Sequence, residues 1–170
     1  MVEVKVWSLA LDEKNQLPVV VLQSLDGTKR LPIWIGPPEA SAIAMEIAGK
    51  KFQRPLTHDL LVSILAGLGA KVRRVEITDL RETTFYAKIY LEAGGELITV
   101  DARPSDSLAV ALKCKARIFV APHLFSSELD ALLQTEAASE AEEPTDEERA
   151  TELKSFLENL NPKDFGKFSF

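Results

Sequence analysis

Two short stretches of this 170-residue sequence combine side chains that can take part in chemistry. The first, residues 54–60, reads "RPLTHDL" and holds one of the two histidines. The second, residues 101–106, reads "DARPSD" and repeats the arginine and proline, a hydroxyl and an acid. Each stretch is expected to begin a helix, where free N–H groups beside an arginine can bind a phosphate.

The same residues also fit ordinary helix starts that need no ligand. Proline stops a helix from extending backwards. The hydroxyl of Thr57 or Ser105 can accept a backbone N–H, and Asp59 or Asp106 complements the helix dipole. Capping and phosphate binding use the same groups, so the two interpretations are compatible and both stay open.

His58 needs a partner from another part of the chain. Neighbouring side chains on a helix point about 100° apart, so His58 and Asp59 are not expected to pair with each other. Asp101 ends a predicted strand and Asp106 opens the next helix, so both could reach His58 if the two helix starts meet. Two carboxylates with a histidine can bind a divalent ion or serve general acid–base catalysis. The alternative is a plain capping or surface histidine.

Hydrophobic periodicity predicts the elements that must position these residues. Strands are expected at residues 2–11, 18–24, 29–35, 71–80, 84–93, 96–101 and 117–121, and helices at 37–49, 57–69 and 106–115. Asp26 and Gly27 form a turn dipeptide between the second and third strands. In strand 84–93, Phe85, Ala87, Ile89 and Leu91 are predicted to face opposite to Tyr86, Lys88 and Tyr90.

The order of these elements predicts an α+β fold with an approximate internal duplication. Two β-β-β-α halves are expected to surround the helix at residues 57–69, and a strand follows the second half. Because leucine and isoleucine cover most of the circumference of helix 57–69, we expect it to be buried between layers.

Charge divides the chain into a body and an acidic tail. Residues 1–125 carry 16 basic and 14 acidic side chains, whereas residues 126–170 carry 4 and 12. We predict a domain over residues 1–125, an acidic linker over 126–144, and a C-terminal helix and tail over 145–170. Leu153, Phe156, Leu157 and Leu160 would form one apolar face of that helix.

Composition excludes several other classes of protein. The single cysteine, Cys114, rules out an internal disulfide and a cysteine-rich zinc site. No apolar run reaches the roughly 18 to 20 residues that span a bilayer, and the first residues show no basic segment followed by an apolar one. We expect a cytoplasmic protein with no membrane partner.

Several stretches together resemble the bifunctional nuclease domain family. They are "LPIWIG" followed by "EASAI", then "RPLTHDLL", "TFYAKI" and "DARPSDSLAVALK", in this order over roughly residues 1–125. The tail "ELKSFLENLNPKDF" also resembles the C-terminal helix of bacterial members. The positions that match the family's motifs are Glu39, Arg54, Pro55, Thr57, His58, Asp59, Asp101, Arg103, Pro104, Ser105 and Asp106.

The resemblance implies an α+β fold, a homodimer, and nuclease activity toward RNA and DNA. The expected catalytic residues are His58, Asp101 and Asp106, and the expected phosphate-binding residues are Arg54, Thr57, Arg103 and Ser105. Mg²⁺ or another divalent cation would be bound by Glu39, Asp59, Asp101 and Asp106. The alternative is a non-catalytic regulatory module in which the helix starts bind an anion or a protein.

Overall fold

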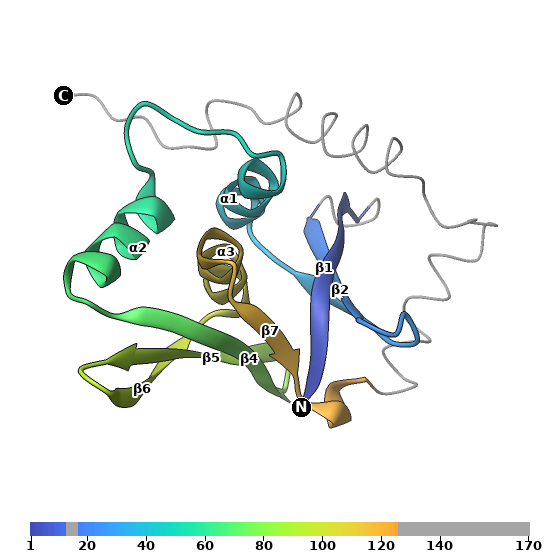
Figure 1. The fold of residues 1–170 in the computed structure, drawn as a ribbon. Helices are drawn as coiled ribbons and strands as arrows, with labels where there is room; N and C mark the ends of the chain where they lie inside the picture. Colours follow the sequence, from blue (N-terminus) through green and yellow to red (C-terminus); the bar gives the residue numbers. More distant parts are fainter. Residues whose placement is uncertain (13–16, 126–170) are drawn as a thin grey trace.

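A seven-stranded sheet and three α helices make up the part of the chain that the structure, a computed structural model, describes: residues 1–12 and 17–125. The sheet bends, and α1 and α3 fill the angle between its two halves (Figure 1). In chain order the elements are β1 Val2–Leu11, β2 Pro18–Ser24, β3 Arg30–Trp34, α1 Pro37–Ile47, α2 Thr57–Gly67, β4 Lys71–Arg81, β5 Thr84–Ala93, β6 Glu96–Ala102, α3 Pro104–Cys114, β7 Arg117–Val120 and the 3₁₀ turn η1 Pro122–Leu124.

The sheet order confirms the predicted α+β class and agrees with an internal duplication. Along the sheet the strands run β3-β2-β1-β7-β4-β5-β6, so β7 lies between two three-stranded meanders, each of which leads into a helix. Only the β4–β7 pair among these neighbours is parallel. Gly27, with φ of +77°, makes the predicted turn between β2 and β3.

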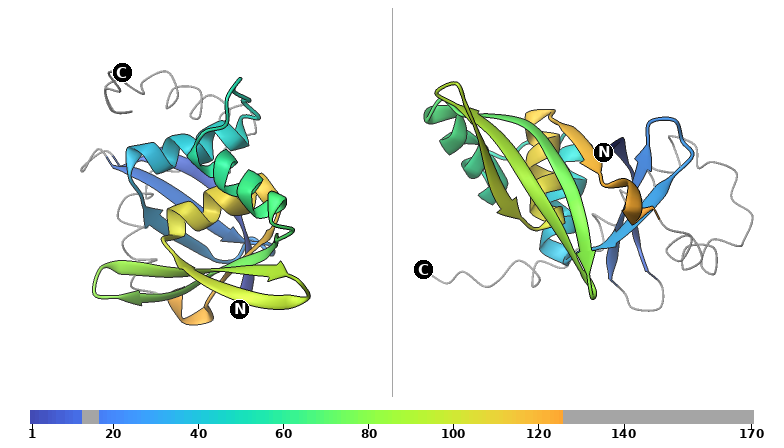
Figure 2. Two further views of the ribbon diagram at one scale, coloured as in Figure 1. Left: turned by 90° about the vertical axis from the view of Figure 1, so that its left-hand side faces the viewer. Right: turned by 90° about the horizontal axis from the view of Figure 1, so that it is seen from below.

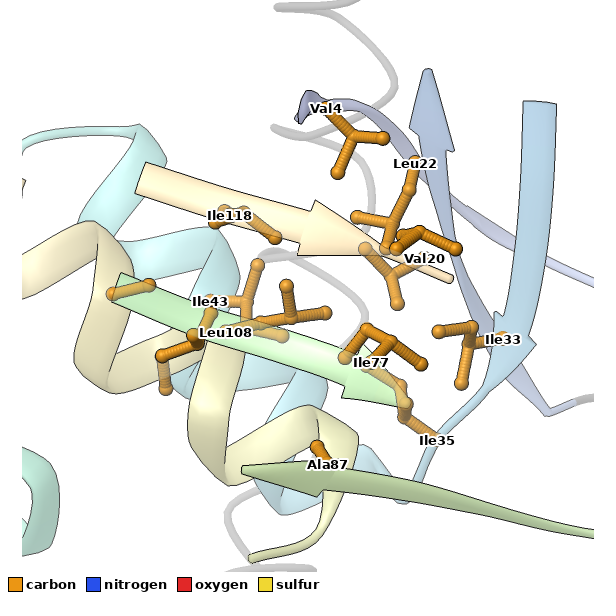
Figure 3. Packing of buried hydrophobic residues seen from close by; sticks show 14 of the residues in the cluster. Val4, Val20, Leu22, Ile33, Ile35, Ile43, Ile77, Ala87, Leu108 and Ile118 are labelled. Atoms are coloured by element: carbon orange, nitrogen blue, oxygen red, sulfur yellow. The ribbon is translucent and has the colours of Figure 1, made fainter. Parts of the chain in front are cut away.

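The hydrophobic core lies where α1 and α3 pack against the inner face of the sheet (Figure 3). Leu22 and Ile77 reach it from the strands, and Ile43 and Leu108 reach it from the helices; all four side chains are fully buried. The predicted alternation in β5 is confirmed, because Ala87, Ile89 and Leu91 are buried and therefore mark the inner face.

The central helix is α3, and the prediction that helix 57–69 would be buried is wrong. Seven of the eleven residues of α3 are buried, and this helix contacts α1, α2 and three strands. None of the eleven residues of α2, all of them described, is buried. The apolar residues of α2 are therefore largely uncovered on this chain.

The predicted acidic linker and C-terminal helix lie outside the described residues. Within residues 1–12 and 17–125, no helix is both long enough and apolar enough to cross a membrane.

Candidate functional site

Three helices each carry an acid in the first turn. These acids are Glu39 in α1, Asp59 in α2 and Asp106 in α3, and each stands three residues after the N-cap. The N-cap residues are Gly36, Leu56 and Arg103, so the prediction that Thr57 or Ser105 caps a helix is wrong by one or two positions. Asp59 stabilises the start of α2, because its Oδ2 accepts a hydrogen bond of 2.9 Å from the N–H of the N-cap residue Leu56.

The partner of His58 is a residue of α3, which agrees with the expectation that it lies in another part of the chain. Its Nε2 lies 3.0 Å from Oδ1 of Asp106, and the His58 side chain is only 14% exposed. The two residues are 48 positions apart, and their contact joins the first turn of α2 to the first turn of α3. The predicted convergence of "RPLTHDL" and "DARPSD" is therefore present for His58 and Asp106.

Arg103 connects this pair to α1. Its Nε donates to Oδ2 of Asp106 at 2.6 Å, and one of its terminal nitrogens lies 2.9 Å from Oε1 of Glu39. The Ser107 hydroxyl donates to the Arg103 carbonyl and holds the backbone at the start of α3. The side chain of Arg103 remains 66% exposed. Glu39, Arg103, Asp106 and His58 thus form one continuous chain of contacts, the His58 cluster.

A second ion-pair group, the Lys113 group, consists of Lys113, Asp59 and Glu46, and Asp59 is the residue after His58 in α2. Nζ of Lys113, near the end of α3, lies 2.5 Å from Oδ1 of Asp59 and 3.0 Å from Oε2 of Glu46 in α1. The Lys113 side chain is 12% exposed. Because His58 contacts the start of α3 and Asp59 contacts its end, the first turn of α2 lies along the side of α3.

One aspartate in each group has a lowered pKa, which favours its charged form. Burial raises the pKa of Asp106, but hydrogen bonds from Arg103 and His58 outweigh it, and the net pKa is lowered. The hydrogen bond from Lys113 is the largest cause of the lowered pKa of Asp59. Burial acts to lower the pKa of Lys113, but hydrogen bonds to Asp59 and Glu46 raise it overall.

These lowered pKa values predict a loss of stability in acid. Asp59 and Asp106 stabilise the fold fully above the ordinary aspartate value of 3.8, and the contribution is lost as pH falls through their lowered folded values. We expect the free energy of unfolding in urea to fall below about pH 4. Asp59→Asn, which removes one titrating group, should show a shallower fall. An unfolding free energy that stays constant into this acid range would contradict the prediction.

Asp101 lies away from the His58 cluster, contrary to expectation. In the β5–β6 pairing it stands opposite Lys88, whose neighbours Ala87 and Ile89 face the core. Paired residues share a face of the sheet, so Asp101 lies on the outer face while α2 and α3 cover the inner one (Figure 1). Asp101 is therefore left out of the site.

The four predicted metal ligands do not come together. Asp106 is bonded to His58 and Arg103, Asp59 to Lys113, and Glu39 to Arg103, while Asp101 lies on the other face. Among the described residues, no group of three or more histidine, cysteine, aspartate or glutamate side chains is placed to hold a metal ion. As arranged here, these carboxylates fit basic side chains rather than one shared cation.

The predicted phosphate-binding residues differ in accessibility. Arg54 and Thr57 are exposed, on the segment before α2 and in its first turn. Ser105 is buried in the first turn of α3, so its hydroxyl is not presented to a substrate. Arg54, Thr57 and Arg103 are therefore the members of this set that a phosphate can reach.

A pocket of about 570 Å³ adjoins the Lys113 group. It lies between the end of α1, the segment at residues 49–55 and the first turns of α2. Asp59 and Lys113 line it, and the exposed Lys50 and Lys51 stand at its margin. The pocket therefore adds exposed positive charge on the side of α2 that carries Asp59.

Gly36 leaves the space that the Glu39 carboxylate occupies. A Cβ at Gly36 would collide with Oε2 of Glu39, although the Gly36 φ of −74° suits any residue. We expect Gly36→Ala to displace Glu39 from Arg103 and to destabilise the protein by up to about 1 kcal/mol, because the displaced atom ends a flexible side chain and Arg103 is mostly exposed. In a Glu39→Ala background the same change should cost clearly less, because nothing remains to collide. Urea unfolding of the four proteins in this cycle measures the difference, and equal costs in both backgrounds would refute the coupling.

Sequence reasoning missed the Lys113 group as part of the site. In the sequence, Lys113 stands close to Lys115 and Arg117, a spacing that is typical of a solvated basic surface. The spacing held a signal, since residues seven apart on a helix lie on the same side, and Lys113 is seven positions after Asp106. Its pairing with Glu46, on a different helix, could not be read from that spacing.

Comparisons with known proteins agree with the family resemblance of the sequence motifs. Residues 20–130 match the bifunctional nuclease domain. An uncharacterized protein of Mycobacterium tuberculosis is 39% identical over 165 residues, which cover 97% of this chain and 98% of that protein. Bifunctional nuclease 1 of Arabidopsis thaliana is 28% identical over 115 residues, 65% of this chain but 35% of the plant protein. Bifunctional nuclease 2 of the same plant is 27% identical over 113 residues. The chain belongs to the bifunctional nuclease domain family.

Proposed function

We propose that this protein is a nuclease that hydrolyses phosphodiester bonds of RNA, DNA or both. The observation that carries the proposal is the contact of His58 with one oxygen of Asp106 while Arg103 binds the other. This arrangement joins a proton-transfer group to an exposed cation that can bind phosphate. Membership of the bifunctional nuclease domain family supports the same chemistry.

His58 would transfer the proton in this reaction. If its Nε2–H donates to the ionised Asp106, the lone pair is on Nδ1, and the carboxylate stabilises the imidazolium that forms. Nδ1 would take a proton from the attacking water as the water oxygen bonds to phosphorus and the phosphorus–oxygen bond to the leaving group breaks. The leaving oxygen keeps the electron pair of that bond and takes a proton from solvent, and the imidazolium of His58 then releases its proton to solvent. Asp106 acts as the positioning residue in this scheme, because it fixes the histidine ring and its tautomer.

Arginine side chains would bind the phosphate. Arg103 is held by Glu39 and Asp106 yet mostly exposed, so its remaining N–H groups can bind a non-bridging oxygen. Thr57 lies beside His58 in the first turn of α2, and Arg54 lies in the segment that precedes this helix. Both residues can contact the neighbouring nucleotide. The homodimer implied by the resemblance belongs to the same proposal.

Binding of Mg²⁺ or another divalent cation is a prediction that the cleavage assay tests. Asp59 or Asp106 would be the carboxylate to hold it, as neither Asp101 nor a shared cluster is available. No step above is assigned to the ion.

The second candidate is a non-catalytic module that binds an anion or a protein. The low exposure of His58 favours it, because a histidine that is 86% covered can serve simply to fasten α2 to α3. Here Arg103, Lys50 and Lys51 would hold the ligand and no bond would be broken.

Digestion of end-labelled nucleic acids separates the two candidates. Single- and double-stranded RNA and DNA would be incubated with the full chain in Mg²⁺, Mn²⁺ and EDTA. Cleavage that depends on His58 supports the nuclease, and loss of that cleavage in EDTA supports the cation. Retained binding by fluorescence anisotropy, with intact substrate under every condition, would instead establish the binding module.

A further inference from the structure

The segment between α1 and α2 places basic and aromatic side chains at the rim of the pocket of about 570 Å³. Residues 50–55 read "KKFQRP" and contain three basic side chains, one aromatic ring and no acid. All six residues are exposed, and all except Arg54 line the pocket. The ring of Phe52 is 52% exposed. Basic groups beside an exposed aromatic ring are the combination that binds single-stranded nucleic acid.

The end of α1 directs this segment across the pocket. The Lys50 N–H donates to the Met45 carbonyl and the Gly49 N–H to the Glu46 carbonyl, a Schellman pattern in which Gly49 has a φ of +63°. The segment then forms a loop that lies on the far side of the helices from β4, β5 and β6 (Figure 1 and the left view of Figure 2). The hydrogen-bonded helix end therefore holds the segment beside the first two turns of α2.

The acidic side chains of the pocket are neutralised by Lys113. Asp59 and Glu46 both line the pocket, and their oxygens lie 2.5 and 3.0 Å from Nζ of Lys113. An ammonium group has three N–H groups, so one of them can still donate to a ligand. The exposed Lys50 and Lys51 then give the rim a positive charge, and the two carboxylates do not repel an anion as free carboxylates would.

We infer that this pocket binds one unpaired nucleotide of a nucleic acid strand. The base stacks on the ring of Phe52, and the Gln53 amide and the remaining N–H of Lys113 bind the edge of the base. Lys50 and Lys51 bind the phosphate. The volume of the pocket lies in the range that encloses small molecules. An inorganic phosphate would use the lysines but leave the Phe52 ring uncovered, so the ring favours a ligand that carries a base.

The spacing along α3 lets one strand occupy the pocket and the His58 cluster together, and in this respect the inference rests on the proposed function. Asp106 contacts His58, and Lys113 lines the pocket seven positions later on the same side of α3. At about 1.5 Å per residue the two positions are about 10.5 Å apart, or about three steps of a stacked strand. The pocket therefore selects strands with an unpaired base about three nucleotides from the cleaved bond, because a base in a duplex cannot reach Phe52.

The first test measures binding of adenosine 5′-monophosphate (AMP), which has no internal phosphodiester bond, to the full chain by isothermal titration calorimetry. AMP should bind at least about 10-fold more tightly than ribose 5-phosphate, which lacks the base. Phe52→Ala should weaken AMP binding by about 5- to 150-fold, the effect of removing one stacking ring. Equal affinity for the two ligands, or AMP binding that Phe52→Ala leaves unchanged, overturns the inference.

Matched variants control for shape and charge in this titration. Phe52→Tyr keeps the ring and should bind AMP like the wild type. Lys51→Ala should weaken AMP binding, whereas Lys71→Ala, at an exposed lysine that begins β4, should not. Phe52 is half exposed, so circular dichroism should show an intact fold for both of its variants. Equal losses in Lys51→Ala and Lys71→Ala would show that charge alone attracts AMP and would overturn the pocket.

The second test distinguishes a nucleotide of the substrate strand from a free nucleotide. Phe52→Ala should raise KM for a labelled single strand by about 5- to 150-fold and leave kcat within about twofold. Cleavage of the matching duplex should be unchanged. Weaker AMP binding with an unchanged KM would show that the pocket takes a free nucleotide, which overturns its role for the strand.

The two tests also separate this inference from the proposed nuclease. If no strand is cleaved under any condition, fluorescence anisotropy of the single strand replaces KM. Binding of AMP and strand that depends on Phe52, without cleavage, supports the pocket and refutes the nuclease. Cleavage that depends on His58, with no effect of Phe52→Ala on AMP binding or on KM, overturns the pocket and leaves the nuclease in place.

Discussion

His58→Ala is expected to lower kcat/KM for nucleic acid cleavage by about 100- to 10,000-fold, the range that removal of a positioned general acid or base produces. The loss should lie in kcat, because Arg103, Arg54 and Thr57 still bind the phosphate. Cleavage of a labelled oligonucleotide gives the rate, and fluorescence anisotropy gives the affinity. Cleavage that is unchanged by His58→Ala would remove His58 from the reaction.

The chain offers a matched control in its other histidine. His123, in η1, also lies near a carboxylate, with its Nε2 3.6 Å from Oδ1 of Asp79, but its side chain is 63% exposed. His123→Ala should cleave at the wild-type rate. Equal losses in the two variants would indicate an unspecific effect of removing a histidine rather than a role at the His58 cluster.

Imidazole rescue separates proton transfer from a purely structural role. His58→Ala leaves a space beside Asp106, and added imidazole can bind there and accept the proton in place of the missing ring. Partial recovery of cleavage, rising with imidazole concentration, is expected for a general base. If His58 only fastened α2 to α3, its removal would lower the thermal midpoint, and imidazole would not restore the rate.

Asp106→Asn tests the positioning residue with almost no change in shape. The amide cannot stabilise a charged His58 or neutralise Arg103, so we expect a loss in kcat that is smaller than for His58→Ala. The pair His58→Ala and Asp106→Asn should be non-additive, because both changes disable one contact.

Local features of the fold could be predicted from the sequence because they depend on nearby residues. The alternation of β5 identified its buried face, and Asp26 and Gly27 identified the hairpin turn. The argument that His58 and Asp59 cannot pair also needed only helix geometry. The structure separates them as expected, with Asp106 beside His58 and Lys113 beside Asp59.

Other features depend on packing that the sequence does not specify. An apolar helix has the same composition whether its own chain or another chain covers it, which is why the burial of α2 was mispredicted. The face on which Asp101 lies follows from its register with Lys88, and a shift by one residue would reverse it. The observed start of α3 differs from the predicted start, because the first residue of this helix is Pro104 rather than Ser105 or Asp106.

The stability of the protein is expected to depend strongly on core side chains far from α2. Leu22→Ala removes a fully buried side chain from β2, where it packs beside Val20 and near Val4 (Figure 3). Truncation of a buried leucine loses the transfer free energy of the missing carbons and leaves a cavity. We expect the free energy of unfolding to fall by about 2–5 kcal/mol, as measured by urea denaturation.

Leu25→Ala is the control for this change, because Leu25 stands three residues later and is 60% exposed. It should alter the unfolding free energy by no more than about 0.5 kcal/mol. A loss below about 1 kcal/mol for Leu22→Ala would contradict the tight packing of the core around β2. At temperatures where Leu22→Ala is still folded, its cleavage rate should match the wild type, because the His58 cluster is built from α1, α2 and α3. Reduced stability with normal cleavage in Leu22→Ala, and the reverse in His58→Ala, would assign folding to the core and chemistry to the cluster.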